Sequence, residues 1–166
     1  MNPIIVFVLL TYMNDANKMD KPRNPIPTID IILSEHSNIN KVLLIKRNKE
    51  PFKDYFSLPG GFVNEGEKVE DAVRREAEEE LLVKVEPIDI LGVYSDPNRD
   101  PRGHIISITF IAKINSGELE AGDGVAELKW VEINNIKDIK LGFDHSRILS
   151  DYEVWRKNKG TYWSSK

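Results

Sequence analysis

β-branched and aliphatic residues gather in short runs that are separated by polar residues and turn formers. Such runs predict β-strands, which we place at 28–35, 41–46, 88–94, 105–114 and 126–131. Small polar residues at 37–40 lie between the first two runs, so we expect those two strands to form a hairpin. The run at 105–114 is apolar enough for a strand in the middle of a sheet.

A different spacing of apolar side chains begins after residue 68. These side chains recur every four residues, at Val69, Val73, Ala77 and Leu81. This period places them on one face of an α-helix, which we expect to be buried. A short helix is predicted at 134–139, and a terminal helix is predicted at 146–158.

Three carboxylates on the first predicted helix need an explanation. Glu76, Glu79 and Glu80 stand three and four residues apart, so they share one helix face, where like charges repel one another. A hard divalent cation with oxygen ligands would turn this repulsion into attraction. Arg75 could hold one of the carboxylates through its forked guanidinium. The alternative is a solvated helix face, which is the usual meaning of an acidic run.

Gly60 and Gly61 follow Pro59 and form a turn in which backbone can approach a ligand closely, although such a turn can also be purely structural. Together with the helix, this turn resembles the signature of Nudix hydrolases. The matching positions are Gly61, Glu67, Arg75, Glu76, Ala77, Glu79, Glu80 and Val83. The chain departs from the signature at Leu82, where the family has a Gly that ends the helix. We therefore expect the helix to end differently, running one more turn before Pro87.

The resemblance implies an α/β fold, the Nudix-type α/β/α sandwich with a mixed curved β-sheet and the signature loop-helix-loop. It implies a metal site with Glu76 and Glu80 as the main ligands, assisted by Glu79 and the Gly60 carbonyl. Arg75 and Glu67 would support catalysis by orienting these carboxylates. Glu127, at the start of the strand predicted at 126–131, would be the general base or a further ligand. It could instead be a charged residue at a strand edge, and the acidic residues at 118–123 are weaker candidates for the base.

The segment 95–104 is rich in turn formers and predicts a loop. It contains Arg99, Arg102 and His104, and we expect the two arginines to hold phosphate or ribose oxygens and the histidine to lie against substrate. The arginines could instead only pair with nearby aspartates. In the resembling family, a proline about fifteen residues after the signature marks the ADP-ribose pyrophosphatase branch, and Pro97 or Pro101 stands there.

The predicted substrate is therefore ADP-ribose, cleaved by water to AMP and ribose 5-phosphate. Phe52 is a candidate for stacking on the base, with a place at the edge of the core as the alternative. Two other functions stay open at this point. One is hydrolysis of another nucleotide, such as an oxidised nucleoside triphosphate, a dinucleoside polyphosphate or NADH. The other is a domain that senses ADP-ribose without cutting it.

Composition narrows the chemistry further. The 166 residues contain no Cys, so a metal must be held by carboxylates, carbonyls or His, which favours Mg²⁺ or Mn²⁺. The net charge of −4 argues against a general nucleic-acid binder, and no apolar run is long enough to span a bilayer. We expect a small-molecule nucleotide as the partner and a cytoplasmic location.

Residues 25–166 are predicted to form a single domain. Residues 1–24 form an N-terminal extension with an apolar run at 4–10. This extension is either an extra strand that adds to a sheet or a partner subunit, or a consequence of a start codon placed too early, with translation beginning at Met13 or Met19. The resemblance also implies a homodimer, because related proteins often exchange N-terminal strands.

Overall fold

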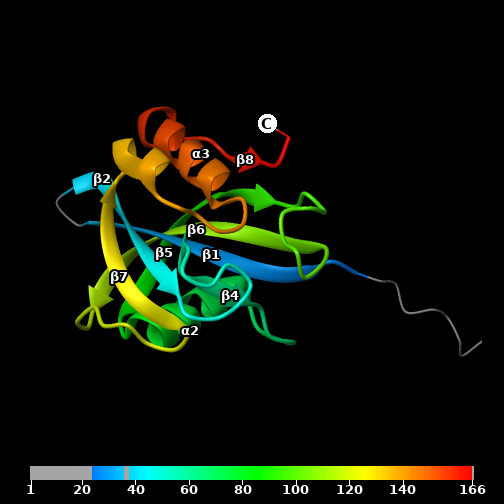
Figure 1. The fold of residues 1–166 in the computed structure, drawn as a ribbon, viewed down its shortest axis with the longest axis horizontal. Coiled ribbons are helices and arrows are strands. Elements are labelled where there is room, and N and C mark those ends of the chain that lie inside the picture. Colours follow the sequence, from blue (N-terminus) through cyan, green and yellow to red (C-terminus); the bar gives the residue numbers. More distant parts are fainter. Residues whose placement is uncertain (1–23, 36–37, 166) are drawn as a thin grey trace, which may run out of the picture.

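The computed structural model describes residues 24–35 and 38–165, so the predictions for the N-terminal extension lie outside the described residues. Its strands and helices are shown in Figure 1. The strands are β1 (Ile26–Glu35), β2 (Asn38–Arg47), β3 (Phe56–Ser57), β4 (Gly60–Phe62), β5 (Lys84–Tyr94), β6 (Ile105–Ser116), β7 (Val125–Glu132) and β8 (Tyr162–Trp163). The helices are α2 (Val69–Leu81), the 3-10 helix η1 (Ile133–Asp138) and α3 (His145–Asn158).

The described strands form one mixed sheet in the order β3-β2-β1-β6-β5-β8, with β4 paired to β1 and β7 paired to β2. β1 runs parallel to β6, and it runs antiparallel to both β2 and β4. The pairing of β1 with β4 sets Thr28, Ile29 and Asp30 beside Phe62, Gly61 and Gly60. The glycine turn therefore lies against the central strand of the sheet, beside Glu76 and Glu80 of α2.

Both faces of the sheet are covered, because alternate residues of the strands point to opposite sides. Ile29, Ile31 and Leu33 of β1 belong to the apolar cluster beneath α2. Ile32 belongs to a second cluster, which contains the apolar side chains of α3 and η1. Figure 1 shows α2 on one side of the sheet and α3 on the other. The predicted α/β/α sandwich with a mixed sheet is thus confirmed.

The apolar face of α2 is also confirmed, since Val73, Ala77 and Leu81 are fully buried and Val69 packs against the same cluster. The prediction for the end of this helix is wrong. Helix α2 stops at Leu81, and Leu82 adopts the left-handed conformation that glycine has in the family, with φ 55° and ψ 26°. A left-handed non-glycine residue costs roughly 1–2 kcal/mol.

The surrounding structure explains why the chain accepts this cost. β5 begins at Lys84, earlier than predicted, so no room exists for another helical turn. The loop between β6 and β7 also binds the last carbonyls of α2, which would otherwise have no partner. The backbone N–H groups of Glu120, Gly122 and Asp123 donate to the carbonyls of Leu81, Glu80 and Glu79 at 3.2, 2.9 and 2.9 Å. Within the described residues, no helix is both long and apolar enough to cross a membrane.

Candidate active site

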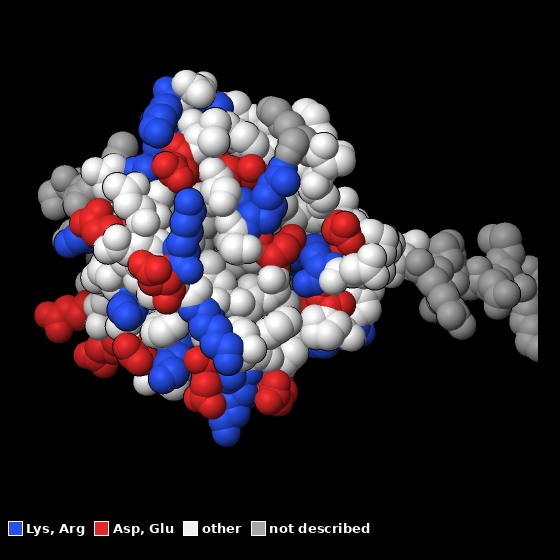
Figure 2. All heavy atoms as spheres, turned by 45° about the horizontal axis from the view of Figure 1, so that its top comes forward, with Lys and Arg blue, Asp and Glu red and all other residues white. Residues whose placement is uncertain are grey.

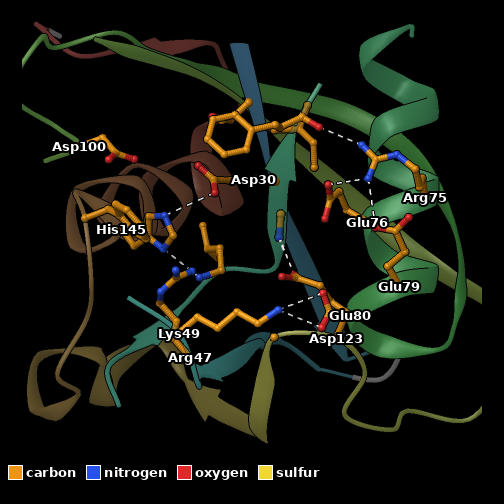
Figure 3. Close-up of a pocket in the computed structure, with 18 of the residues that line it drawn as sticks. Asp30, Arg47, Lys49, Arg75, Glu76, Glu79, Glu80, Asp100, Asp123 and His145 are labelled. Atoms are coloured by element: carbon orange, nitrogen blue, oxygen red, sulfur yellow. Dashed lines mark hydrogen bonds and ion pairs between the residues drawn. The ribbon is translucent and has the colours of Figure 1, made fainter. Parts of the chain in front are cut away.

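A cleft of about 340 Å³ opens where the signature helix, the glycine turn and four connecting segments meet. Its walls come from β1, β4, α2, the segment after β2, the loop before β6, the end of the β6–β7 loop and the residues leading into α3. Most of the side chains labelled in Figure 3 are charged, with the carboxylates of α2 on one side and Arg47, Lys49 and His145 on the other. The cleft is thus suited to a charged ligand, either alone or together with a bound metal cation.

Two of the three signature carboxylates are held inside this cleft and are not splayed into solvent. Glu76 is only 9% exposed. Glu80 accepts a hydrogen bond from the backbone N–H of Gly60, at 2.9 Å from its Oε2. Glu79 lies at the rim, with about half of its side chain exposed. The acidic face of α2 is therefore not the ordinary solvated face that a charge run usually forms.

The glycine turn lets these carboxylates lie directly against backbone. A Cβ on Gly61 would lie 2.3 Å from Oε1 of Glu76, far closer than two such atoms can approach. Gly60 has a φ of 149°, and a Cβ there would lie 2.2 Å from the carbonyl oxygen of Ile29. Any larger residue would push Glu76 away or would separate β4 from β1. The sequence therefore needs glycine at both positions if carbonyl and carboxylate oxygens are to converge here.

Arg75 joins the carboxylates to one another. Its guanidinium binds both oxygens of Glu67, at 2.8 and 3.0 Å, and donates to the carbonyl of Phe62 at 2.9 Å. The same group reaches Oε1 of Glu76 at 2.7 Å and Oε2 of Glu79 at 3.2 Å. Glu67 is fixed in turn by the N–H of Asn64. These contacts place the guanidinium of Arg75 between Glu67 on one side and the carboxylates of Glu76 and Glu79 on the other.

Burial raises the pKa values of two of these glutamates. The pKa of Glu80 is raised to about 8, because burial and the nearby charges of Glu76 and Asp30 outweigh the Gly60 N–H and Arg47. Burial also raises the pKa of Glu76, although Arg75 opposes the shift. Without a cation, ionisation of these carboxylates in the cleft is unfavourable. A bound cation would make their ionised form favourable, so the raised pKa values are typical of a cation site.

The residues present fit a divalent cation. The oxygen donors that line the cleft are the carboxylates of α2 and the backbone of Gly60, which are hard ligands typical of Mg²⁺ and Mn²⁺. Among the described residues, no three acidic or histidine side chains already point at one common position. Arg75 occupies Oε1 of Glu76, and Gly60 occupies Oε2 of Glu80. Each carboxylate therefore keeps its other oxygen for a cation.

A buried network of charged and polar groups lies on the floor of the cleft. Asp30 is 8% exposed, accepts a hydrogen bond from Ser107 at 2.5 Å, and lies 3.4 Å from Nε2 of His145. The N–H of Leu58 donates to Nδ1 of His145 at 2.9 Å, which leaves Nε2 to carry the ring proton toward Asp30. Burial raises the pKa of Asp30, but His145 and Arg99 outweigh it, so the pKa lies below its usual value.

Arg99 belongs to this network. Its guanidinium makes two hydrogen bonds to Asp144, at 2.9 and 2.7 Å, and contacts Asp30 at 3.5 Å. The side chain is only 3% exposed. Arg99 therefore lines the cleft with its hydrogen bonds already committed to protein carboxylates. The structure supports the alternative considered for this residue, pairing with aspartates, although the partners are not the neighbours in its own loop.

The structure brings some of the other predicted residues to the cleft and leaves others outside it. Arg102 lines the cleft, paired through two hydrogen bonds with Asp100. Phe52 packs edge to face on Phe143, behind the cleft wall. His104 is exposed, with its Nε2 3.2 Å from the carbonyl of Ser95.

Glu127 is also outside the cleft. It lies on β7 opposite Lys46, and the two side chains form an exposed ion pair at 3.8 Å. Asp123, one of the weaker candidates for the base, does line the cleft. It is fixed there because its own N–H is bonded to the end of α2. The resemblance alone implied Glu127, and a match in sequence position does not fix the direction of the side chain.

Sequence reasoning missed several residues of the cleft. They include Asp30, Arg47, Lys49, Phe143 and His145. Asp30 did carry a signal, since an acidic residue within an otherwise apolar strand is costly unless it is paired. Lys49 binds both oxygens of Asp123, at 3.0 and 3.3 Å, across the cleft (Figure 3). These two residues are 74 positions apart, so no local pattern could have paired them.

Comparison with known proteins agrees with this geometry. A NUDIX domain model matches residues 25–152. An ADP-ribose pyrophosphatase from Methanocaldococcus jannaschii is 50% identical over 144 residues, which are 86% of this chain and 81% of that protein. A MutT/nudix family protein from Enterococcus faecalis is 30% identical, with a TM-score of 0.71 over 92% of this chain and 71% of the other.

The fold is also that of the NUDIX domain of Shewanella oneidensis NrtR, solved with ADP ribose. That structure has a TM-score of 0.72 and 23% identity, and the match covers 87% of this chain and 98% of the other. The domain model spans most of the chain, including the glycine turn and the carboxylate helix. The chain therefore belongs to the NUDIX domain family.

Proposed function

We propose that the protein hydrolyses ADP-ribose to AMP and ribose 5-phosphate with the help of Mg²⁺, for which Mn²⁺ can substitute. The observation that carries this proposal is the pair of shielded carboxylates, Glu76 and Glu80, held beside the glycine turn in a charged cleft. The choice of substrate is supported by the relative that is 50% identical and is named an ADP-ribose pyrophosphatase.

The diphosphate bond resists water because its oxygens carry negative charge. Glu76, Glu79, Glu80 and the Gly60 carbonyl would hold a divalent cation, which would neutralise part of this charge and lower the pKa of the attacking water. Arg75 and Glu67 keep the carboxylates oriented. Water attacks one phosphorus atom, the P–O bond to the bridging oxygen breaks, and the two products are monophosphates.

Side chains of the opposite wall complete the mechanism. We assign Arg47 and Lys49 to the diphosphate oxygens, because both are cations that line the cleft across from α2. We assign Asp123 as the acceptor of the proton from the attacking water, replacing Glu127, since Asp123 lines the cleft and Glu127 does not. Binding of substrate to Lys49 would release Asp123 from its ion pair and leave its carboxylate available.

Product analysis with a panel of substrates tests the proposal. The protein is incubated with Mg²⁺ and with ADP-ribose, an oxidised nucleoside triphosphate, a dinucleoside polyphosphate or NADH, and the products are separated by chromatography. We expect ADP-ribose to give the highest kcat/KM, with AMP and ribose 5-phosphate in equal amounts. Faster turnover of another compound would assign a different substrate. Tight binding of ADP-ribose without any cleavage would identify a sensing domain.

Two further properties belong to the same proposal. We propose a homodimer, which light scattering coupled to size-exclusion chromatography would measure directly. A monomer at micromolar concentration would contradict it. We also propose a cytoplasmic location, in keeping with a nucleotide substrate and a site without cysteine.

On the face drawn in Figure 2, basic and acidic side chains are interspersed and are not gathered by sign.

A further inference from the structure

The loop between β6 and β7 is joined to the end of α2 by backbone hydrogen bonds. The N–H of Gly122 donates to the carbonyl of Glu80, and the N–H of Asp123 donates to the carbonyl of Glu79, each at 2.9 Å. Both glutamates also line the cleft. Their side chains therefore belong to the candidate metal site, while their carbonyls hold the loop that carries the residue we assign as the proton acceptor.

The same loop is joined to the opposite wall of the cleft. The carbonyl of Gly124 accepts a hydrogen bond from the N–H of Asn48 at 3.1 Å, and the Asp123 carboxylate lies 3.0 Å from Nζ of Lys49. The side chains of Lys49 and Asp123 are 63% and 81% exposed, so their ion pair alone stabilises this arrangement little. The position of Asp123 therefore depends mainly on the backbone of the loop, which reaches from α2 to the segment after β2.

Gly122 lets the loop lie this close to α2. A Cβ on Gly122 would lie 2.0 Å from the carbonyl oxygen of Glu79 and 3.1 Å from the carbonyl carbon of Glu80. Ordinary contact begins at 3.4 Å, so a side chain here would push the loop back by about 1.4 Å. The atoms that it would meet belong to the helix backbone, which cannot rotate away as the end of a flexible side chain could.

The backbone conformation gives no other reason for glycine at this position. Gly117 and Gly124 in the same loop have φ values of 100° and 75°, which side chains disfavour, but Gly122 has no positive φ. Alanine could therefore adopt the backbone conformation of Gly122 if the helix were not beside it. This position needs glycine only because of the short distance between the loop and α2.

We propose that Gly122 is a positioning residue, which sets the distance between the Asp123 carboxylate and the carboxylates of Glu79 and Glu80. Gly122 is not among the residues that line the cleft, and it acts by letting the loop bind directly to the end of α2. The proton acceptor and the metal ligands are then fixed to the same helix end and keep one geometry. This inference rests on the proposed function, because Gly122 acts only through Asp123 as the proton acceptor.

The test compares catalysis, binding and backbone exchange in the Gly122→Ala variant. Its kcat for ADP-ribose should fall about 30- to 100-fold, because a catalytic group displaced by about 1 Å can lose this much. The KM and the calorimetric affinity for Mg²⁺ should change less than about threefold, since the side chains of α2 stay in place. In EDTA and without substrate, the Asp123 N–H should exchange with deuterium at least about tenfold faster by NMR. Gly160→Ala, at a glycine with φ 103° and open space around it, is the control for backbone strain and should leave kcat unchanged.

A double-mutant cycle separates positioning from general damage to the fold. When Gly122→Ala is combined with Asp123→Asn, kcat should match that of Asp123→Asn alone within about threefold, because no carboxylate is left to misplace. Losses that multiply in the double variant would overturn the positioning role. A kcat for Gly122→Ala within about twofold of the wild-type value would overturn it as well.

Failure of the proposed function gives a different pattern. If the wild-type protein cleaves another nucleotide of the panel, the substrate is wrong, and the same cycle measured with that nucleotide decides the role of Gly122. If Asp123→Asn alone keeps a normal kcat, the proton acceptor is wrong and the positioning role fails with it. A wild-type protein that cleaves no nucleotide of the panel would overturn both proposals. An Asp123 N–H that exchanges at the wild-type rate in Gly122→Ala would overturn the positioning role alone, since the loop would not have moved.

Discussion

Replacing Glu80 with Gln is expected to stabilise the metal-free protein and to remove most of its activity. Glu80 sits in the cleft with its Oε2 2.9 Å from the N–H of Gly60. The amide oxygen of Gln can accept the same hydrogen bond, so the substitution mainly removes the charge. A residue retained for function often costs stability in this way.

The magnitude follows from the pKa of Glu80. Its pKa in the folded protein is raised to about 8 from an ordinary value of 4.5. The folded state therefore holds the proton more tightly than the unfolded state between these two values. The stability from the protonated group is fully present below pH 4.5 and is lost as the pH rises through about 8. Each pKa unit corresponds to about 1.4 kcal/mol, and because the group keeps some contact with water we expect an effect of about 2 kcal/mol.

The assay is urea unfolding in EDTA between pH 5 and pH 8.5. The wild-type free energy of unfolding should fall across this range, whereas that of Glu80→Gln should fall less, with the remaining slope due partly to Glu76, whose pKa is also raised. The variant should be about 2 kcal/mol more stable at pH 8.5 and nearly equal at pH 5. Glu78→Gln, an exposed substitution on the same helix, is the control. With Mg²⁺ and ADP-ribose, Glu80→Gln should lose at least about 100-fold in kcat.

The reasoning would be refuted if Glu80→Gln and the wild type had the same pH slope, since the charge of Glu80 would then be fully solvated. A near-normal kcat in the variant would refute the role of Glu80 as a metal ligand, because the cation would then have to bind elsewhere. A variant that gains stability at high pH and loses activity would support both the unfavourable charge of Glu80 in the metal-free protein and its role as a metal ligand.

The remaining predictions concern the glycine turn, the buried network and the base. Gly61→Ala should weaken Mg²⁺ binding at least about tenfold by calorimetry, since the new Cβ meets the Glu76 carboxylate; unchanged affinity would show that Glu76 is not a ligand. Asp30→Asn should lower the free energy of unfolding by roughly 3 kcal/mol, because it removes the buried carboxylate that pairs with Arg99 and faces Nε2 of His145. A loss under about 1 kcal/mol in urea would contradict this. Asp123→Asn should lower kcat about 100-fold, whereas Glu127→Gln should change kcat less than twofold. If steady-state kinetics gave the opposite result, Glu127 would be the general base.

The sequence by itself determined the longer strands, the buried face of α2 and the acidic face beside it. The four-residue spacing of Val73, Ala77 and Leu81 fixed which side of α2 is buried, and the positions of Glu76 and Glu80 between them placed the carboxylates beside that face. Both depend only on the geometry of one helix, which repeats every 3.6 residues whatever surrounds it. Periodicity within a single element can therefore be read directly from the chain.

Tertiary structure decided which charged and aromatic residues face the cleft. Arg99 and Arg102 stand in one predicted loop, yet one is buried against Asp144 and the other lies over Phe62. Leu82 takes a conformation that its side chain disfavours, because neighbouring strands and loops fix the end of α2. These outcomes depend on contacts between residues far apart in sequence, whose energies no local pattern contains. Only the packing of the sheet between its two helical layers brings those residues together.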